Sequence, residues 1–384
     1  MFMMVSRFLL VVCVVLQCPS GLAQIPIIPD WSYDEENSTG FFDPAPSPEA
    51  GYGSIGELRR TVFTAAANYV GALFSPAYAT EVIRVKAAFT NLGPETVGNG
   101  GPLGYTNNFG SKNPKYRPNV DYTTTLGNHV AGRELVALNT LTVNFNTNPA
   151  ITYNYNTNES SSLGSGQESL FTTVIHELIH GMGFINYVNP ESGSFDGFPT
   201  AYDALIVQDN VNPVAYTALT DAQRLAAITS NNLFWNGPLG VAGNGGVRPA
   251  LSAPETYSGS SSISHLDTTI FDPFGLLLLP RDSPLVQAQV GLSALERGML
   301  YDMGFTPALP RIQSITTIGG QHVVTANGIL NARYRLRFTT ALTDGLKATN
   351  WTSIGSTVRS GWNTVSLTNA PSDSNGFYAV EIVP

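Results

Sequence analysis

The stretch HELIHGMGFIN, residues 176–186, predicts a helix with two histidines on one face. Side chains four residues apart project from the same side of an α-helix, so His176 and His180 can direct imidazole nitrogens to one point. Glu177 follows the first histidine and would lie beside that point. This pattern is typical of zinc sites in which the glutamate acts as a general base. It also arises by chance in amphipathic core helices, so the rest of the chain has to decide between the two interpretations.

The end of this helix raises the question of a third metal ligand. Gly183 can turn the chain sharply, because glycine readily adopts a left-handed backbone conformation. A catalytic zinc ion takes three protein ligands and keeps one position open, so a third histidine would be expected after the turn. Asn186 stands there instead. A carboxamide oxygen is a weak zinc donor, and we therefore expect the third ligand from elsewhere in the chain.

Five other residues are candidates for that ligand: His129, His265, His322, Asp196 and Asp203. We expect His129 at the surface or in a helix cap, His322 in an exposed turn, and the two aspartates in capping or surface positions. His265 lies 85 residues after His180, at the end of a stretch rich in Gly, Asn and Ser, and is the strongest candidate. Asp267, two residues further on, would either orient a ligand histidine or cap the following turn.

Composition and charge restrict the class of protein. Of the 384 residues, 43% are hydrophobic and 12% charged, and the formal net charge is −9. Such an acidic chain is a poor partner for nucleic acid or for anionic membranes. Residues 1–23 carry Arg7 ahead of an apolar run and end in Gly-Leu-Ala, as a secretory signal peptide does. No later segment has the roughly 18 apolar residues of a membrane span. We expect no transmembrane segment and a location outside the cell, at the cell surface, or in the periplasm if the chain is retained.

Two regions flank the central part of the chain. Residues 24–53 are rich in Pro, Asp, Ser and Gly without periodicity, which predicts an extended arm or a pro-segment. Residues 306–384 contain short alternating runs separated by turn residues, which predicts a small all-β, sandwich-like module. Tyr334, Trp351 and Tyr378 are among its aromatic residues. Most such aromatics belong to a core, and a face that binds carbohydrate or a surface is the alternative.

The central part, residues 54–305, mixes helix and strand patterns in an α+β order. For the motif helix, Ser165 and Glu168 have the spacing of a capping box and predict a start near Gly166. A strand over 141–147 is a candidate edge on which an extended peptide could lie, with an ordinary buried strand as the rival interpretation. The other predicted elements are helices that follow Ser54, Thr220 and Ser293, a strand near 83–89, and loops over 91–120 and 231–264.

These motifs together resemble the metzincin zinc peptidases, and among them the leishmanolysin-like branch. In that branch a long insertion separates the second histidine from the third. A short segment ending in Leu-Met-x-Pro and a helix ending in Asp-x-Gly-Phe then follow. Here SSSISHLD (260–267), LLLLP (276–280) and GLSALERGMLYDMGF (291–305) occur in the same order. The resemblance spans roughly residues 55–305 and is most specific at its two ends.

The resemblance implies a fold and a set of site residues. The fold would be a twisted sheet with an active-site helix and a C-terminal subdomain of helices and loops, joined to a β-module of a type found in exported bacterial proteins. His176, His180 and His265 would bind one catalytic zinc ion, and Glu177 would act as the general base. Nothing in the sequence supports a structural calcium ion.

Two departures from the family bear on this expectation. Leu278 occupies the place of the methionine that lies beneath the metal in these families. Exchange of leucine for methionine nearly conserves volume, so it does not exclude activity. Both cysteines, Cys13 and Cys18, lie in the predicted signal peptide, so neither the family's disulfides nor a cysteine latency switch would be present after its removal.

The sequence therefore predicts an exported zinc endopeptidase that hydrolyses peptide bonds in proteins or peptides by a zinc-activated water, with Glu177 as general base. The alternative is a non-catalytic secreted binding protein on a peptidase scaffold that acts through its C-terminal β-module. A third possibility within the enzymes is a zinc hydrolase that uses Asp203 or Asp196 as its third ligand.

Overall fold

The computed structural model describes residues 24–157, 163, 166–259, 261–271, 276–280, 291–319, 321–328, 332–339, 351–360, 364–369 and 377–383. The predicted signal peptide and Ser165 lie outside these residues. The chain divides into two units: the larger one ends at Ala308 and the smaller one begins at Leu309. The sequence-based boundary lies after residue 305. Within the described residues, every helix is too short or too polar to serve as a membrane span.

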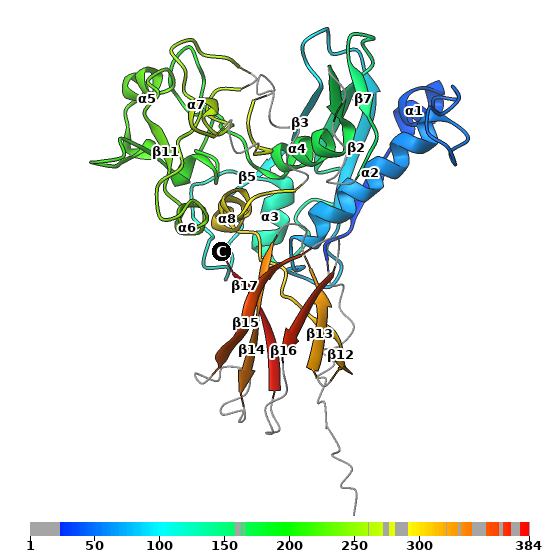
Figure 1. The fold of residues 1–384 in the computed structure, drawn as a ribbon. Helices are drawn as coiled ribbons and strands as arrows, with labels where there is room; N and C mark the ends of the chain where they lie inside the picture. Colours follow the sequence, from blue (N-terminus) through cyan, green and yellow to red (C-terminus); the bar gives the residue numbers. More distant parts are fainter. Residues whose placement is uncertain are drawn as a thin grey trace, which may run out of the picture. The chain divides into compact units, whose positions relative to one another are not determined.

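A four-stranded sheet forms one side of the larger unit, with the strand order β1-β2-β6-β3 (Figure 1). β2 pairs in parallel with β1 and with β6, whereas β3 pairs antiparallel with β6. Because β6 has a partner on both sides, the strand over 141–147 is the ordinary buried strand of the rival interpretation, and β1 and β3 are the edges of the sheet. The strands are β1 (Ile27–Asp30), β2 (Ile83–Thr90), β3 (Gly98–Pro102) and β6 (Leu141–Asn146).

Two long helices, α2 (Ile55–Ala72) and α4 (Leu170–Met182), pack against each other, and α4 also lies on β3 and β6. The predicted cap of α2 is confirmed, because the Ser54 hydroxyl accepts the Glu57 N–H at 3.2 Å. The approach of α4 to the edge strand requires glycine, since a Cβ at Gly100 would overlap the backbone of Glu177. The glycine-rich edge thus lets the motif helix lie directly on the strand.

The motif helix begins later than its sequence suggested. Residues 167–169 form the strand β8 (Gln167–Ser169), which pairs in parallel with β7 (Thr152–Asn154). Ser169 is the N-cap, because its hydroxyl accepts the Thr172 N–H at 3.3 Å. The predicted start near Gly166 is therefore wrong by about one helical turn. Residues 167–169 pair with β7 as a strand, in place of the first helical turn that the capping-box spacing predicted.

Residues 24–53, predicted as an extended arm or pro-segment, are folded into the larger unit. Besides β1 they form α1 (Ser32–Asn37) and the 3₁₀ turn η1 (Gly40–Phe42). Phe41 is fully buried, with its ring 5.0 Å from that of Phe89 and 5.5 Å from that of Phe63. An isolated aromatic in a Pro- and Asp-rich segment has no periodicity, so the sequence pattern did not reveal this anchor.

The rest of the larger unit lies on the other side of α4 from the sheet, around α5, α6, α7 and β11 (Figure 1). The capping boxes at Thr220 and Ser293 are confirmed. The predicted loops over 91–120 and 231–264 are wrong in part, because the first contains β3 and β4 and the second contains β11 and α6. The remaining elements are β4 (Tyr105–Thr106), β5 (Tyr122–Thr123), α3 (Thr124–Ala131), η2 (Asp203–Leu205), β9 (Ile206–Gln208), β10 (Val214–Ala215), η3 (Tyr216–Ala218), α5 (Asp221–Ala227), β11 (Leu233–Trp235), α6 (Pro238–Gly243), α7 (Thr268–Phe271) and α8 (Ala294–Met303).

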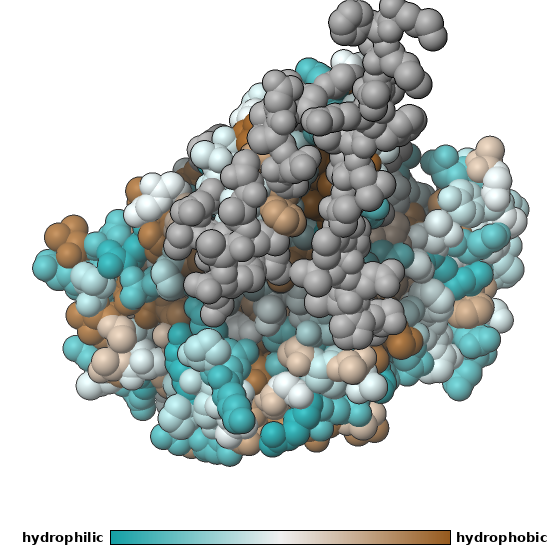
Figure 2. Space-filling view, turned by 90° about the horizontal axis from the view of Figure 1, so that it is seen from below, coloured by the Kyte–Doolittle hydropathy of each residue, from teal (hydrophilic) through white to brown (hydrophobic). Residues whose placement is uncertain are grey.

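The smaller unit contains six strands among its described residues, arranged in two antiparallel three-stranded sheets ordered β12-β13-β16 and β15-β14-β17. Alternate residues such as Val324, Leu336 and Leu367 are buried. Figure 2 views the chain, and not the smaller unit alone, from below. Among its coloured residues, hydrophilic and hydrophobic ones are interspersed, with many of intermediate hydropathy. The strands are β12 (Ile312–Ile318), β13 (Gln321–Asn327), β14 (Arg333–Thr339), β15 (Thr352–Arg359), β16 (Thr364–Asn369) and β17 (Phe377–Val383).

Candidate metal centre

Three histidines converge between the two sides of the larger unit. His176 and His180 lie on α4, and His265 comes from the segment that precedes α7. The Nε2 atom of His180 lies 2.9 Å from that of His176 and 3.2 Å from that of His265, and the third Nε2 pair is 3.2 Å apart. The structure thus brings together the three histidines that the sequence suggested as one ligand set, and they could bind a metal ion.

The opposite nitrogen of each ring faces a backbone carbonyl. His176 Nδ1 is 2.5 Å from the oxygen of Leu277, His180 Nδ1 is 2.7 Å from that of Phe184, and His265 Nδ1 is 2.9 Å from that of Ser261. A carbonyl oxygen can only accept, so each Nδ1 must donate a hydrogen. In a neutral ring the Nε2 atom then carries a lone pair, and this tautomer is the one that binds metals through Nε2.

This arrangement fits a metal ion. Burial lowers the pKa of all three imidazoles, that of His180 to about 3, so the rings are neutral near pH 7. Three lone pairs that face one another repel unless a cation lies among them. Nitrogens at about 2.0–2.1 Å from one ion, at tetrahedral angles, would lie about 3.4 Å apart, close to the separations here. Imidazole donors suit zinc and also copper, iron and nickel, so geometry alone leaves the metal open.

Asn186 links the end of the motif helix to the third histidine. Gly183 ends α4 with a φ of 130°, and the chain turns back so that the Phe184 carbonyl reaches His180. The Asn186 N–H then donates to the hydroxyl of Ser264 at 2.9 Å. Its side-chain amide donates to Asp203. Asn186 is therefore a connector to the residue before His265, with its side-chain amide bonded to Asp203.

The turn that carries His265 is strained. Ile263 has a φ of 69°, in the left-handed region that a β-branched residue rarely adopts. Hydrogen bonds hold it there: Tyr202 donates its hydroxyl to the Ile263 carbonyl at 2.6 Å, and Ser252 donates its N–H to the His265 carbonyl at 2.9 Å. Such strain persists only where surrounding contacts over-determine the conformation, and it is common at functional sites.

The segment 276–280 bonds to the centre and to its neighbours. Leu277 supplies the carbonyl for His176, and Leu278 is fully buried where the resembling family has methionine. The Leu278 carbonyl accepts the N–H of Leu266, the residue after His265, at 2.8 Å. Its own N–H donates to a carboxylate oxygen of Glu296 on α8 at 2.7 Å. This short segment therefore contacts the neighbours of two of the three histidines.

Glu177 lies beside the histidines on the face of α4 that meets the edge strand. Its side chain is 6% exposed, and its carboxylate has no hydrogen-bond partner among the described residues. Burial raises its pKa to about 8. A cation held by the three imidazoles would oppose this shift, because a nearby positive charge favours the ionised carboxylate. The Glu177 side chain therefore lies against the edge strand at Gly98, one residue along α4 from His176.

Both aspartates proposed as alternative ligands lie outside the cluster. Asp203 is fully buried, where it accepts the Thr200 N–H at 2.9 Å and the Asn186 amide. Burial raises its pKa to about 6. Asp196 is exposed. Asp267 accepts hydrogen bonds from the N–H and the hydroxyl of Thr269 at the start of α7, so it caps that turn. The Nδ1 atom of His265 bonds to the Ser261 carbonyl instead of to Asp267.

The expectations for the other two histidines need correction. His129 is 1% exposed, with Nδ1 2.8 Å from the Glu81 carboxylate and Nε2 accepting the Thr306 N–H at 2.9 Å. It is a core residue, because a paired imidazole can be buried at little cost. His322 is half-buried within β13, where its ring lies 5.9 Å from that of Tyr378, and it is not in a turn.

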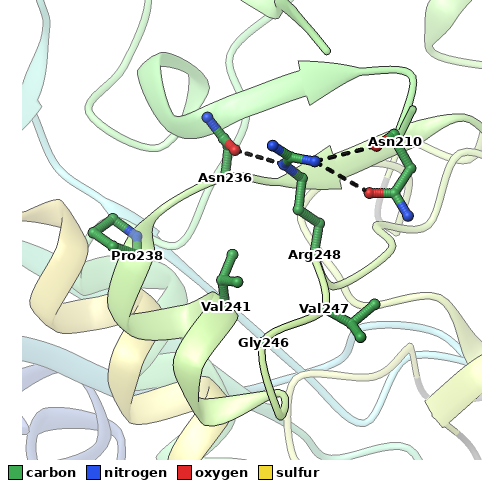
Figure 3. A pocket seen from close by; sticks show the side chains of 7 residues that line it. All are labelled: Asn210, Asn236, Pro238, Val241, Gly246, Val247 and Arg248. Atoms are coloured by element: carbon green, nitrogen blue, oxygen red, sulfur yellow. Dashed lines mark hydrogen bonds between the residues drawn. The ribbon is translucent and has the colours of Figure 1, made fainter. Parts of the chain in front are cut away.

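A pocket elsewhere in the larger unit has a volume of about 410 Å³ and includes Val241 and Val247 in its walls. Figure 3 shows the guanidinium of Arg248, another lining residue, bonded to the side chain of Asn236 at 2.6 Å and to the carbonyl of Asn210 at 3.1 Å. None of its lining residues belongs to the histidine centre.

Comparisons of the chain with protein families, characterised proteins and solved structures find no match. The candidate centre therefore rests on its geometry and its sequence pattern.

Several groups of the site were not foreseen from the sequence. The three carbonyls that fix the rings carry no side-chain signal, because any residue can supply a carbonyl. The sequence predicted Glu296 only as the glutamate of a capping box, and this pattern gives no sign of its second contact, with Leu278. The glycines at 98, 100 and 101 were a readable signal of close backbone approach, which we interpreted only as a loop.

Replacement of His265 tests the ligand set. We expect one zinc ion per wild-type chain, and we expect His265→Ala to weaken zinc binding by more than the 10–100-fold typical of groups that only support a ligand. His322→Ala, which alters a histidine of the smaller unit, should keep wild-type affinity. Zinc content and competition with a chromophoric chelator measure both. Full zinc retention by His265→Ala would remove His265 from the ligand set.

The raised pKa of Glu177 gives the metal-free protein a specific pH dependence. The usual value is 4.5, so between pH 4.5 and about 8 the unfolded chain has released this proton while the folded chain still holds it. The carboxyl group therefore costs more stability as pH rises. We expect the free energy of unfolding of Glu177→Gln, measured by urea denaturation, to exceed that of wild type by on the order of a few kcal/mol at pH 8 and to be nearly equal to it at pH 4.5. Glu191→Gln, at an exposed glutamate, is the control; a constant difference at both pH values would contradict the assignment.

Proposed function

We propose that this protein is an exported zinc-dependent endopeptidase. The observation that carries the proposal is the convergence of three Nε2 lone pairs beside a buried glutamate on a helix that lies directly on a sheet edge. A structural metal site closes all its positions with protein ligands and needs no adjacent carboxylate. Three ligands with a neighbouring glutamate are instead the arrangement of a hydrolytic site. The resemblance of residues 55–305 to metzincin peptidases agrees with this reaction class.

The chain's own residues would have separate tasks in peptide hydrolysis. His176, His180 and His265 would hold the ion, with their tautomers fixed by the three carbonyls. When bound, zinc lowers the pKa of water to roughly 7 and polarises a carbonyl group. Glu177 would take a proton from the attacking water and return it to the leaving amine, as general base and then general acid. Its buried position would keep bulk water from competing for that proton.

The edge strand β3 supplies a place for the substrate. Leu103 donates its N–H to Thr140, and Val97 accepts the N–H of Asn146 across the β3–β6 ladder. In an antiparallel pair alternate residues face the partner, so Gly98 and Gly100 direct their backbone groups away from β6. These are the residues that contact the motif helix around Glu177. An extended peptide added to this edge would pass the candidate metal position.

The role of Glu177 is tested by its isosteric amide. We expect Glu177→Gln to keep stoichiometric zinc and to lose about 10²–10⁴-fold in the rate of cleavage of an unstructured protein, the range typical of a general acid–base group. Glu191→Gln should cleave at the wild-type rate. Gel or fluorescence assays with and without chelator give the rates. If neither zinc-loaded wild type nor zinc-loaded Glu177→Gln cleaved the substrate, the binding-protein alternative would be favoured.

Substrate addition to β3 predicts an alternating dependence on backbone amides. A peptide that the enzyme cleaves can be resynthesised with one N-methyl group at each successive amide. We expect methylation to abolish cleavage at every second position on one side of the scissile bond, because only alternate N–H groups would reach the strand. Cleavage rates measured by chromatography give the pattern. Tolerance or loss at consecutive positions without alternation would exclude this binding mode.

A further inference from the structure

Glu296, on the first turn of α8, is a fully buried carboxylate that bonds in two directions. One oxygen accepts the N–H of Ser293 at 2.6 Å, as the glutamate of a capping box does. The other oxygen accepts the N–H of Leu278 at 2.7 Å, outside its own helix. A capping box explains the first bond and leaves the second unexplained.

The second bond fixes a segment on which two of the histidines depend. The Leu277 carbonyl, one residue away, lies 2.5 Å from His176 Nδ1. The Leu278 carbonyl accepts the N–H of Leu266 at 2.8 Å, and Leu266 follows His265 directly. A displacement of this segment would therefore rotate the His176 ring and shift the backbone of His265 together. Among the described residues, Glu296 is the only side chain besides His176 itself that is seen to bond the backbone of 276–280.

We infer that Glu296 is a positioning residue of the metal centre, which acts through the backbone of Leu277 and Leu278 to orient His176 and His265. The inference rests on the proposed function, because it assumes that the three histidines bind a metal ion. The hydrogen bonds of its carboxylate to Ser293 and Leu278 go to backbone N–H groups and not to an imidazole ring. Its effect is to keep three lone pairs aimed at one point.

A carboxylate suits this position better than an amide. The two N–H groups, from Ser293 and Leu278, each require a separate acceptor oxygen. Glutamine offers one oxygen and one NH₂ group, so one of the two N–H groups would face another donor. Aspartate offers two oxygens on a shorter side chain, which would reach one N–H group only if it released the other. Both substitutions should therefore free the 276–280 segment or the helix cap.

Asp302 provides a matched control on the same helix. It is also fully buried, and it accepts the N–H groups of Leu239 at 3.0 Å and Gly240 at 2.8 Å. These bonds join α8 to α6 and do not involve residues 276–280. Asp302 also accepts the indole N–H of Trp235 at 3.3 Å. Asp302→Asn thus alters a buried carboxylate of α8 whose hydrogen bonds to Leu239, Gly240 and Trp235 lie outside residues 276–280. Any loss caused only by a weakened α8 should appear in this variant as well.

The test compares wild type, Glu296→Gln, Glu296→Asp and Asp302→Asn as complete chains. We expect both Glu296 variants to bind zinc 10–100-fold more weakly, the range for groups that orient a ligand, and to change the visible absorption spectrum of the cobalt-substituted protein. Asp302→Asn should keep wild-type affinity and spectrum even where its urea midpoint falls as far. Either Glu296 variant suffices if the other does not fold.

The possible outcomes separate the two proposals. Wild-type zinc affinity and an unchanged cobalt spectrum in a folded Glu296 variant would overturn the positioning role and leave the metal centre intact. Equal weakening in Asp302→Asn would reduce Glu296 to a stabilising residue of the helix. A wild-type chain that binds neither zinc nor cobalt would overturn the metal centre itself.

Discussion

Three imidazole rings donate their Nδ1 hydrogens to backbone carbonyls and direct their Nε2 lone pairs at one another. The surrounding parts of the larger unit hold the rings in this mutually repulsive arrangement. Each carbonyl belongs to a different turn: one ends the motif helix, one precedes His265, and one lies in the segment 276–280. The rings can converge only while all three turns keep their shape. The glycine turn at 183, the left-handed Ile263 and the carboxylate of Glu296 are the devices that hold them.

Placing a buried glutamate beside this cluster adds a second demand. Among the described residues Glu177 has no hydrogen-bond partner that would stabilise its ionised form, so the fold without a cation favours the protonated carboxyl group. The metal-free site is therefore a place where the fold holds a destabilised group, and such groups are common where stability is exchanged for function. A bound cation would satisfy the histidines and the glutamate together, which makes the two features one electrostatic unit.

The sequence predicted the helices with capping boxes and the strands with clear alternation, because these depend on local patterns within one segment. The residues 167–169 were missed because pairing with β7 overrides the Ser165–Glu168 spacing, and β3 was missed because glycines carry no hydrophobic period. At the site, the His-Glu-x-x-His spacing predicted that His176 and His180 share one face of a helix. The order of the motifs after this helix pointed to His265 as the third ligand. Asn186 and Asp203 could not be assigned in this way, since their hydrogen bond to each other joins segments that only the tertiary fold brings together.

The distance along the chain between the second and third histidines has a consequence for a protein whose cysteines lie in its predicted leader. An ion bound by His180 and His265 would cross-link residues 85 apart. Closing a loop of that length removes conformational freedom from the unfolded chain worth about 4–5 kcal/mol when a disulfide does it. The ion would thus serve as a reversible cross-link, and the supply of the metal would govern the lifetime of the folded chain.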